Sequence, residues 1–129
     1  MNLRYVIIYV PDVPATIDFY ANAFGLEPGF LHDSGTYGEM VTGETRLAFS
    51  AISLMQSIGK AVATEPPERP SFEIAFETDD VTAALARALA AGATPVQDVM
   101  RMEWGQTTAY VRAPEGTLVE ICTPVEPAG

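Results

Sequence analysis

Two glutamates interrupt hydrophobic segments that otherwise have the composition of β-strands. Glu73 lies in "SFEIAFETDDV", and Glu120 lies in "TLVEIC" close to the end of the chain. A carboxylate in apolar surroundings can act as a general base, bind a cationic group, or provide oxygen ligands to a hard metal ion. Which of these Glu73 and Glu120 can do depends on the strand face that carries them.

The segment around Glu73 has a counterpart near the start of the chain, "RYVIIYVPDV". In both copies an apolar segment runs into Asp-Val, at Asp12 and again 68 residues later at Asp80, and a helical pattern follows. Asp12 and Asp80 are predicted N-caps, because their carboxylates can accept hydrogen bonds from the free amides of the first helical turn. Gly25 and Gly92 are the predicted helix stops.

Three strand-like segments follow each predicted helix. The first set is "GFLHDS", "YGEMVT" and "TRLAFS", and the second set is "PVQDVMRME", "QTTAYVR" and "TLVEIC". Each half therefore has the order βαβββ, which predicts one α+β domain over residues 1–129, with an eight-stranded curved sheet around a shared cleft. Module one is expected at residues 1–50, a linker at 51–70 and module two at 71–124.

Side-chain alternation assigns Glu73 to one face of its strand. Phe72, Ile74 and Phe76 share the other face, and this bulky apolar face is the one expected to lie under the helix. Glu73 is then on the opposite face, which we call the inner face.

The same alternation assigns inner-face positions in the other strands. Tyr5, Ala48 and Glu120 take positions equivalent to that of Glu73 in the first and last strands of the two modules. Tyr110 on the adjacent strand is expected to line the same concavity, with Met40 as its counterpart in module one. An inner face that is half-buried and reached by water would also tolerate these acids.

The composition and net charge of the chain restrict the classes of molecule that it can bind. The chain has 129 residues, 48% hydrophobic and 19% charged, as expected for a globular domain. Its formal net charge of −10 disfavours nucleic acid and anionic lipid and favours a cationic small molecule. No apolar run is long enough for a membrane span, and Pro11 ends the N-terminal apolar stretch early. With a single cysteine, Cys122, these features predict a cytoplasmic protein.

Three segments, "YVIIYVPDVPATIDFYANAFGL", "FEIAFETDDVTAALARALAAGA" and "WGQTTAYVRAPEGTLVEI", resemble the glyoxalase, bleomycin-resistance and extradiol-dioxygenase superfamily, also called vicinal oxygen chelate proteins. The resemblance covers nearly the whole chain outside the linker and implies paired βαβββ modules. It implies less about function, because the superfamily contains lyases, epimerases, oxygenases, transferases and non-enzymatic drug binders.

The resemblance also implies where a metal would bind. Metal-dependent members carry ligands near the start of each module's first strand and near the end of its last strand. Those places hold Tyr5, Ala48, Glu73 and Glu120, of which only Glu120 matches the common ligand. We therefore expect no metal cofactor, with Glu73 and Glu120 as fallback ligands for a divalent metal. The single histidine, His32, is expected in a loop outside this set.

Without a metal, two carboxylates facing one pocket would repel each other. The repulsion could be relieved by an arginine, by a proton shared between the acids, or by a cationic ligand. The candidate arginines are Arg46, Arg101 and Arg112. The ligand alternative resembles the metal-free, drug-sequestering branch of the superfamily, whose members are acidic homodimers.

We predict a metal-independent homodimer that binds a cationic or aromatic small molecule and resembles bleomycin-resistance-type proteins. Its pocket would be lined by Tyr5, Glu73, Trp104, Tyr110 and Glu120. Trp104 in "MEWGQ" could stack on a planar ligand or pack at an interface. No catalytic residue is assigned. The alternative is a glyoxalase-like lyase or isomerase, or a dioxygenase, with Glu73 or Glu120 as general base or metal ligand. A vestigial pocket is a third interpretation.

Overall fold

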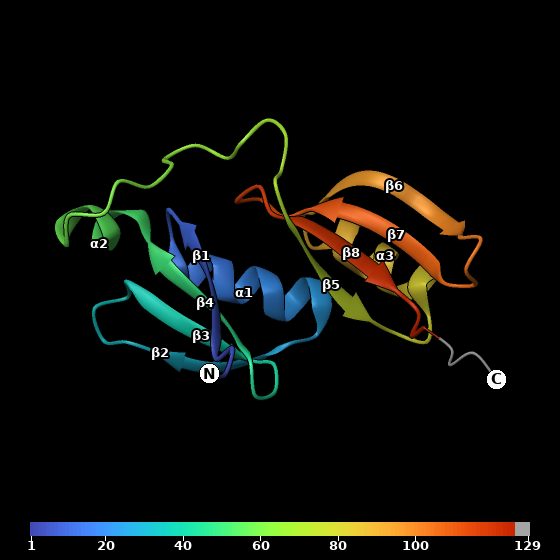
Figure 1. The fold of residues 1–129 in the computed structure, drawn as a ribbon, viewed down its shortest axis with the longest axis horizontal. Helices are drawn as coiled ribbons and strands as arrows, with labels where there is room; N and C mark the ends of the chain where they lie inside the picture. Colours follow the sequence, from blue (N-terminus) through green and yellow to red (C-terminus); the bar gives the residue numbers. More distant parts are fainter. Residues whose placement is uncertain (126–129) are drawn as a thin grey trace. The chain divides into compact units, whose positions relative to one another are not determined.

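The computed structural model describes residues 1–125 and consists of two compact units, Met1–Pro66 and Pro67–Gly129. Each unit contains one four-stranded sheet and one helix of ten or more residues, α1 in the first and α3 in the second (Figure 1). Within the described part of the chain, no helix has both the length and the apolar character that crossing a membrane requires.

The first unit has the order βαβββ, followed by a short helix. Its elements are β1 Tyr5–Val10, α1 Val13–Phe24, β2 Glu27–Leu31, β3 Tyr37–Val41, β4 Arg46–Ala51 and α2 Ile52–Ser57. The strand order in the sheet is β1-β4-β3-β2, with β1 parallel to β4 and the other neighbours antiparallel.

The second unit repeats this topology. Its elements are β5 Glu73–Glu77, α3 Val81–Ala90, β6 Thr94–Arg101, β7 Thr107–Arg112 and β8 Leu118–Cys122. The strand order is β5-β8-β7-β6, and β5 is parallel to β8. The predicted α+β class, the two βαβββ modules and the eight strands are confirmed. A cleft shared by the two sheets stays a prediction.

The ends of the long helices follow from the capping residues. Asp12 Oδ1 accepts a hydrogen bond from the Ala15 amide at 3.0 Å, and Asp80 Oδ1 accepts one from the Ala83 amide at 3.0 Å. Gly25 ends α1 with φ of 70°, a left-handed conformation that a residue without Cβ adopts at little cost. The predicted N-caps and the stop at Gly25 are confirmed.

A continuous apolar core fills the space between α1 and its sheet, which lie against each other in Figure 1. Its buried members are Ile8, Val10, Val13, Ile17, Tyr20, Met40, Leu47 and Phe49. The helix approaches β3 closely at Gly38, where a Cβ atom would lie 2.5 Å from Ile17 Cδ1. The second unit has an equivalent core between α3 and its sheet, formed by Val81, Leu85, Ala88, Ala109, Val111, Val119 and Ile121.

The prediction that Met40 is the counterpart of Tyr110 is wrong. Tyr110 pairs with Glu120 across β7 and β8, and the residue in the equivalent place of the first unit, opposite Ala48, is Glu39. Met40 is fully buried on the helix side of β3, the side that Gly38 shares. The pairing register of β3 with β4 turns the Met40 side chain toward the helix. Its flexible apolar side chain fills space in the core there.

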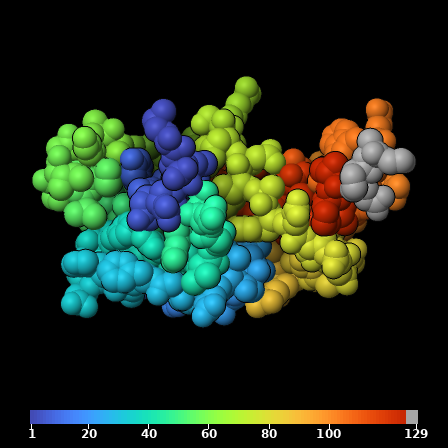
Figure 2. Space-filling model, turned by 60° about the horizontal axis from the view of Figure 1, so that its bottom comes forward, coloured from blue at the N-terminus to red at the C-terminus, as the bar shows by residue number. Residues whose placement is uncertain are grey.

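The residues before β1 lie along the β3–β4 turn of the first unit. Thr45 Oγ1 donates to the Leu3 carbonyl at 2.7 Å, and the Arg46 amide donates to the Arg4 carbonyl at 2.7 Å. Figure 2 shows this blue segment against the turquoise turn. A surface hollow of about 490 Å³ lies here, lined by Met1, Asn2, Leu3, Arg4, Glu44 and Thr45. None of these lining residues belongs to the predicted pocket.

Candidate functional site

Tyr110 joins the two predicted acids on the inner face of the second sheet. Its hydroxyl lies 3.2 Å from Glu120 Oε2 and 3.2 and 3.5 Å from the two carboxylate oxygens of Glu73. A phenol has one proton, so Tyr110 can donate to one of the two carboxylates at a time. The arrangement is a carboxylate–phenol–carboxylate cluster, which we call the Glu73–Tyr110–Glu120 cluster.

Strand pairing explains why these three side chains meet. Glu120 pairs with Ala75 on one side and with Tyr110 on the other, so both neighbours share its face of the sheet. Glu73 lies two residues before Ala75 and has the same orientation. The cluster therefore spans three adjacent strands, β5, β8 and β7, and β8 is in the middle.

Thr108 is a fourth member that the sequence analysis missed. Its Oγ1 donates to Glu120 Oε2 at 2.7 Å, so this oxygen lies within hydrogen-bond distance of both Thr108 and Tyr110. Thr108 is almost fully buried, with 1% of its surface exposed. The sequence could have indicated this member, because Thr108 lies two residues before Tyr110 on the same strand and residues two apart on a strand share a face.

Arginines do not relieve the repulsion between the two acids. Among the described residues, no ion pair joins an arginine to Glu73 or Glu120. Arg112 instead donates to the backbone carbonyls of Gly116, Glu68 and Pro67. The groups that contact the acids include the hydroxyls of Tyr110 and Thr108.

Burial and the nearby carboxylates raise the pKa values of two neighbouring proton donors, Tyr110 and Cys122. Burial, then the charges of Glu120 and Glu73, raise the pKa of Tyr110 above the usual value of tyrosine. Cys122 is buried at the end of β8, and burial together with the charges of Glu120 and Glu77 raises the pKa of its thiol. Both groups therefore stay protonated at neutral pH, and Tyr110 remains a hydrogen-bond donor.

The other predicted site residues lie elsewhere. Tyr5 is half-exposed in β1 of the first unit. Trp104 is 64% exposed in the turn between β6 and β7, where its indole Nε1 donates to Gln106 Oε1 at 2.7 Å. His32 is exposed in the turn after β2 and contacts Ser34. This position confirms the expectation that His32 lies in a loop. Within the second unit, the structure thus brings Glu73, Tyr110 and Glu120 together.

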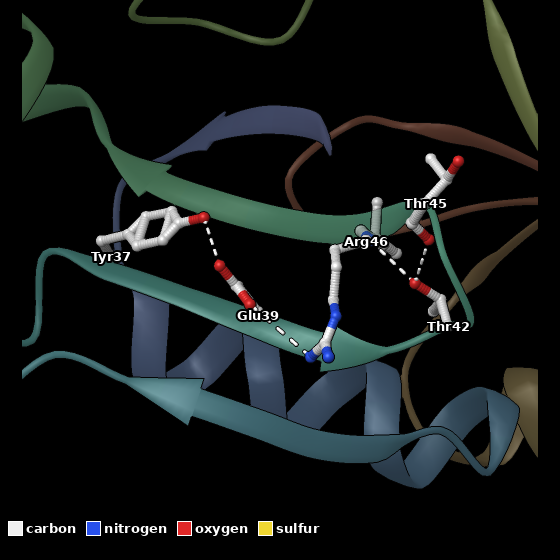
Figure 3. A network of polar contacts seen from close by, with 6 residues as sticks. Tyr37, Glu39, Thr42, Thr45 and Arg46 are labelled. Atoms are coloured by element: carbon white, nitrogen blue, oxygen red, sulfur yellow. Dashed lines mark hydrogen bonds and ion pairs between the residues drawn. The ribbon is translucent and has the colours of Figure 1, made fainter. Parts of the chain in front are cut away.

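The first unit carries a different network at the equivalent place. The Tyr37 hydroxyl donates to Glu39 Oε2 at 2.7 Å, and Arg46 Nη1 lies 3.7 Å from Glu39 Oε1. Figure 3 shows Tyr37 and Arg46 reaching Glu39 from opposite sides. Burial and the Glu39 contact raise the pKa of Tyr37. The two sheets share a topology, but their inner faces differ in charge.

The residues at the implied metal-ligand places do not match a transition-metal site. Ala48 offers a methyl group, and Tyr5 stands where an imidazole or carboxylate is usual. The two remaining places hold Glu73 and Glu120, whose carboxylates contact the hydroxyls of Tyr110 and Thr108. In residues 1–125 no group of three or more His, Cys, Asp or Glu side chains is placed to hold a metal ion. Two carboxylates are fewer than the three or four protein ligands such sites use.

Comparison with protein families gives one match over nearly the whole chain. The model of the glyoxalase/bleomycin resistance protein/dioxygenase superfamily matches residues 2–121. A comparison with curated protein sequences gives no match.

Solved structures with similar folds include two described as enzymes. A glyoxalase-related enzyme from Fulvimarina pelagi has a TM-score of 0.83 and 24% identity, covering 100% of this chain and 93% of its own. A glyoxalase/bleomycin resistance protein/dioxygenase family enzyme from Burkholderia phytofirmans PsJN has a TM-score of 0.83 and 24% identity, covering 98% and 100%. TioX from Micromonospora sp. ML1 has a TM-score of 0.72 and 21% identity, covering 95% and 98%. At this identity the likeness establishes the fold.

Proposed function

The chain belongs to the glyoxalase/bleomycin resistance protein/dioxygenase superfamily, and we propose that within it this protein binds a cationic, aromatic small molecule without a metal ion. The site is the inner face of the second sheet, at the Glu73–Tyr110–Glu120 cluster. The observation that carries the proposal is the contact of one phenol hydroxyl with two carboxylates at 3.2 Å each.

The cluster has more negative charge than its own donors neutralise. Tyr110 can donate one proton to the pair, and Thr108 donates to Glu120. Both donors are neutral, so two formal charges remain on adjacent strands. A ligand ammonium group would neutralise part of that charge and gain charge-assisted hydrogen bonds, which are stronger than neutral ones. The chain's net charge of −10 also attracts cations to the surface.

Binding can be measured with 2-naphthylmethylammonium as a cationic probe and 2-naphthylmethanol as its neutral counterpart. Calorimetric titration should show the ammonium probe binding about tenfold more tightly, as expected for hydrogen bonds to charged groups. Glu73→Gln and Glu120→Gln should remove most of that preference. Glu44→Gln, which removes an equal charge in the β3–β4 turn, should leave most of it. Equal binding of both probes by the unmodified protein would contradict the proposal.

The metal-free part of the proposal has its own test. Protein purified without chelators should contain less than about one tenth of an equivalent of any transition metal by elemental analysis. A stoichiometric metal that is lost in Glu120→Gln would overturn this part of the proposal. In that case the two carboxylates would act as metal ligands.

A second candidate function is proton transfer, as in a lyase or isomerase. The observation that favours it is the same hydroxyl, because Tyr110 places a protonated acid within 3.2 Å of two potential bases. A carboxylate would remove a proton next to a substrate carbonyl, and Tyr110 would protonate the developing oxyanion. Exchange of such protons for deuterium, followed by NMR in heavy water, would reveal the activity. Tyr110→Phe should then abolish exchange while retaining ligand binding.

A further inference from the structure

Arg112 lies in the same row of the second sheet as Glu73. Leu118 of β8 pairs with Glu73 of β5 on one side and with Arg112 of β7 on the other. Directly paired residues point to the same face, so all three side chains are on the inner face. Adjacent strands are about 4.8 Å apart, which places the backbones of Arg112 and Glu73 about 10 Å from each other. An arginine and a glutamate side chain, both extended, can meet across one intervening strand.

The segment before β5 holds the Arg112 guanidinium. We call residues 67–70 the strap, which leads into β5 and is yellow-green in Figure 1. Arg112 Nη1 donates to the Glu68 carbonyl at 3.2 Å, and Nη2 donates to the Pro67 carbonyl. On the same side chain, Nε donates to the Gly116 carbonyl at 2.8 Å. All three nitrogens of the guanidinium therefore bond to backbone carbonyls.

Glu73 gains no charge compensation from this arginine. Its carboxylate contacts the Tyr110 hydroxyl, and among the described residues no ion pair joins it to an arginine. Glu73 is exposed, and an exposed ion pair contributes little, so three carbonyls held in place can retain the guanidinium. Pro67 and Pro70 restrict the strap, which lowers the entropy cost of holding its carbonyls there. The order of the strap thus decides which partner Arg112 takes.

We propose that the strap regulates the cationic site by keeping Arg112 away from Glu73. With the strap in place, both carboxylates of the Glu73–Tyr110–Glu120 cluster stay available to a ligand ammonium group. When the strap is released, Arg112 pairs with Glu73 and competes with the ligand for that carboxylate. The proposal rests on the function proposed above, and it adds a regulatory segment that lies outside the cluster.

The first test loosens the strap without changing either charged residue. Pro67→Gly/Pro70→Gly widens the conformations open to the strap, so Arg112 should leave it more often. Calorimetric titration should then show 2-naphthylmethylammonium binding about threefold more weakly, the size of an exposed ion pair, with 2-naphthylmethanol unchanged. Adding Arg112→Gln should restore the affinity, because the competing cation is gone. Unchanged ammonium affinity in the loosened variant, or no restoration by Arg112→Gln, would overturn the proposal.

Arg101→Gln is the matched control for charge. It removes an equal charge from the same unit, at the exposed end of β6. Added to the loosened variant, Arg101→Gln should leave the ammonium affinity low. If it restores the affinity as well as Arg112→Gln does, general charge and not pairing with Glu73 controls binding, and the proposal is wrong.

NMR of the Arg112 Nε proton tests the strap without a ligand, so it separates this proposal from the function on which it rests. With the strap intact, Glu73→Gln should leave that resonance nearly unchanged, because the guanidinium bonds to backbone carbonyls. In Pro67→Gly/Pro70→Gly, Glu73→Gln should shift it, since the carboxylate is then a partner. A resonance that moves in neither background would refute the regulation even if the ammonium probe binds. Equal binding of the two naphthyl probes by the unmodified protein would instead overturn the proposed function, and the regulation with it.

Discussion

At the scale of single residues, Tyr110 performs a role that the sequence analysis gave to an arginine, a shared proton or a ligand. Its hydroxyl reaches both carboxylates of the cluster, and its raised pKa keeps the proton in place. The sequence indicated that Tyr110 lines the same face as Glu73 and Glu120. It did not indicate the bridge, because side-chain alternation gives the face of a residue and not the reach of its terminal atom.

Tyr110→Phe should therefore destabilise the protein. The expected loss is about 1 kcal/mol at pH 7, below the usual range for hydrogen bonds to charged groups because the cluster is partly exposed. Urea unfolding measures the change. Tyr9→Phe is the control, since Tyr9 is 42% exposed on β1 and outside the cluster. An effect of Tyr110→Phe no larger than that of Tyr9→Phe would show that the bridge contributes nothing.

The same bridge has a pH dependence with a defined sign. The pKa of Tyr110 is higher in the folded protein than its ordinary value of 10.0, so the unfolded chain loses this proton first. The contribution is then fully present below about pH 10 and declines as pH rises further. The difference in unfolding free energy between the unmodified protein and Tyr110→Phe should therefore be constant from pH 8 to about 10 and shrink at about pH 11. A difference that grows with alkaline pH would contradict this.

At the scale of elements, the features predicted correctly from the sequence are those that depend on a local pattern of residues. Asp12, Asp80 and Gly25 act as predicted, because capping needs a particular residue within one turn of the helix. Met40 was misplaced because its face depends on how β3 pairs with β4, and a shift of one residue exchanges the two faces. The Tyr37–Glu39–Arg46 network was missed for the same reason.

Removal of either N-cap carboxylate tests whether capping stabilises α1 and α3. Asp12→Ala and Asp80→Ala should each lower the free energy of unfolding by about 1 kcal/mol, the usual effect of losing an N-cap hydrogen bond. Asp12→Asn should retain most of the stability, since its amide oxygen can also accept from Ala15. Asp18→Ala removes an equal charge from the exposed side of α1 and should have a smaller effect. If Asp18→Ala costs as much as Asp12→Ala, the effect is one of charge and not of capping.

The approach of α1 to β3 gives a second test at this scale. Gly38→Ala would bring a Cβ atom to 2.5 Å from Ile17 Cδ1 and 3.1 Å from the Phe30 carbonyl oxygen. Overpacking of this kind costs about 1–3 kcal/mol. Ile17→Val removes the clashing methyl, so the double variant should be more stable than the sum of the two single changes predicts. Strict additivity in thermal unfolding would mean that the helix moves away instead.

At the scale of the whole molecule, one topology appears twice with different chemistry on its inner faces. The second unit presents two carboxylates, and the first presents the Glu39 carboxylate with the Arg46 guanidinium 3.7 Å away. Strand order and core follow from the apolar pattern that both copies share. The chemistry of each face is set by the residues that point away from the helix, where the two copies are free to differ.

The net charge of −10 acts on the approach of a charged ligand to the proposed site. It should speed the approach of 2-naphthylmethylammonium, because the overall field attracts cations. Raising the ionic strength from about 0.01 M to 0.15 M shortens the screening length from about 30 Å to 8 Å. The stopped-flow association rate should therefore fall for the ammonium probe, with that of 2-naphthylmethanol unchanged. If the rate for the ammonium probe does not fall, local contacts rather than the overall charge control association.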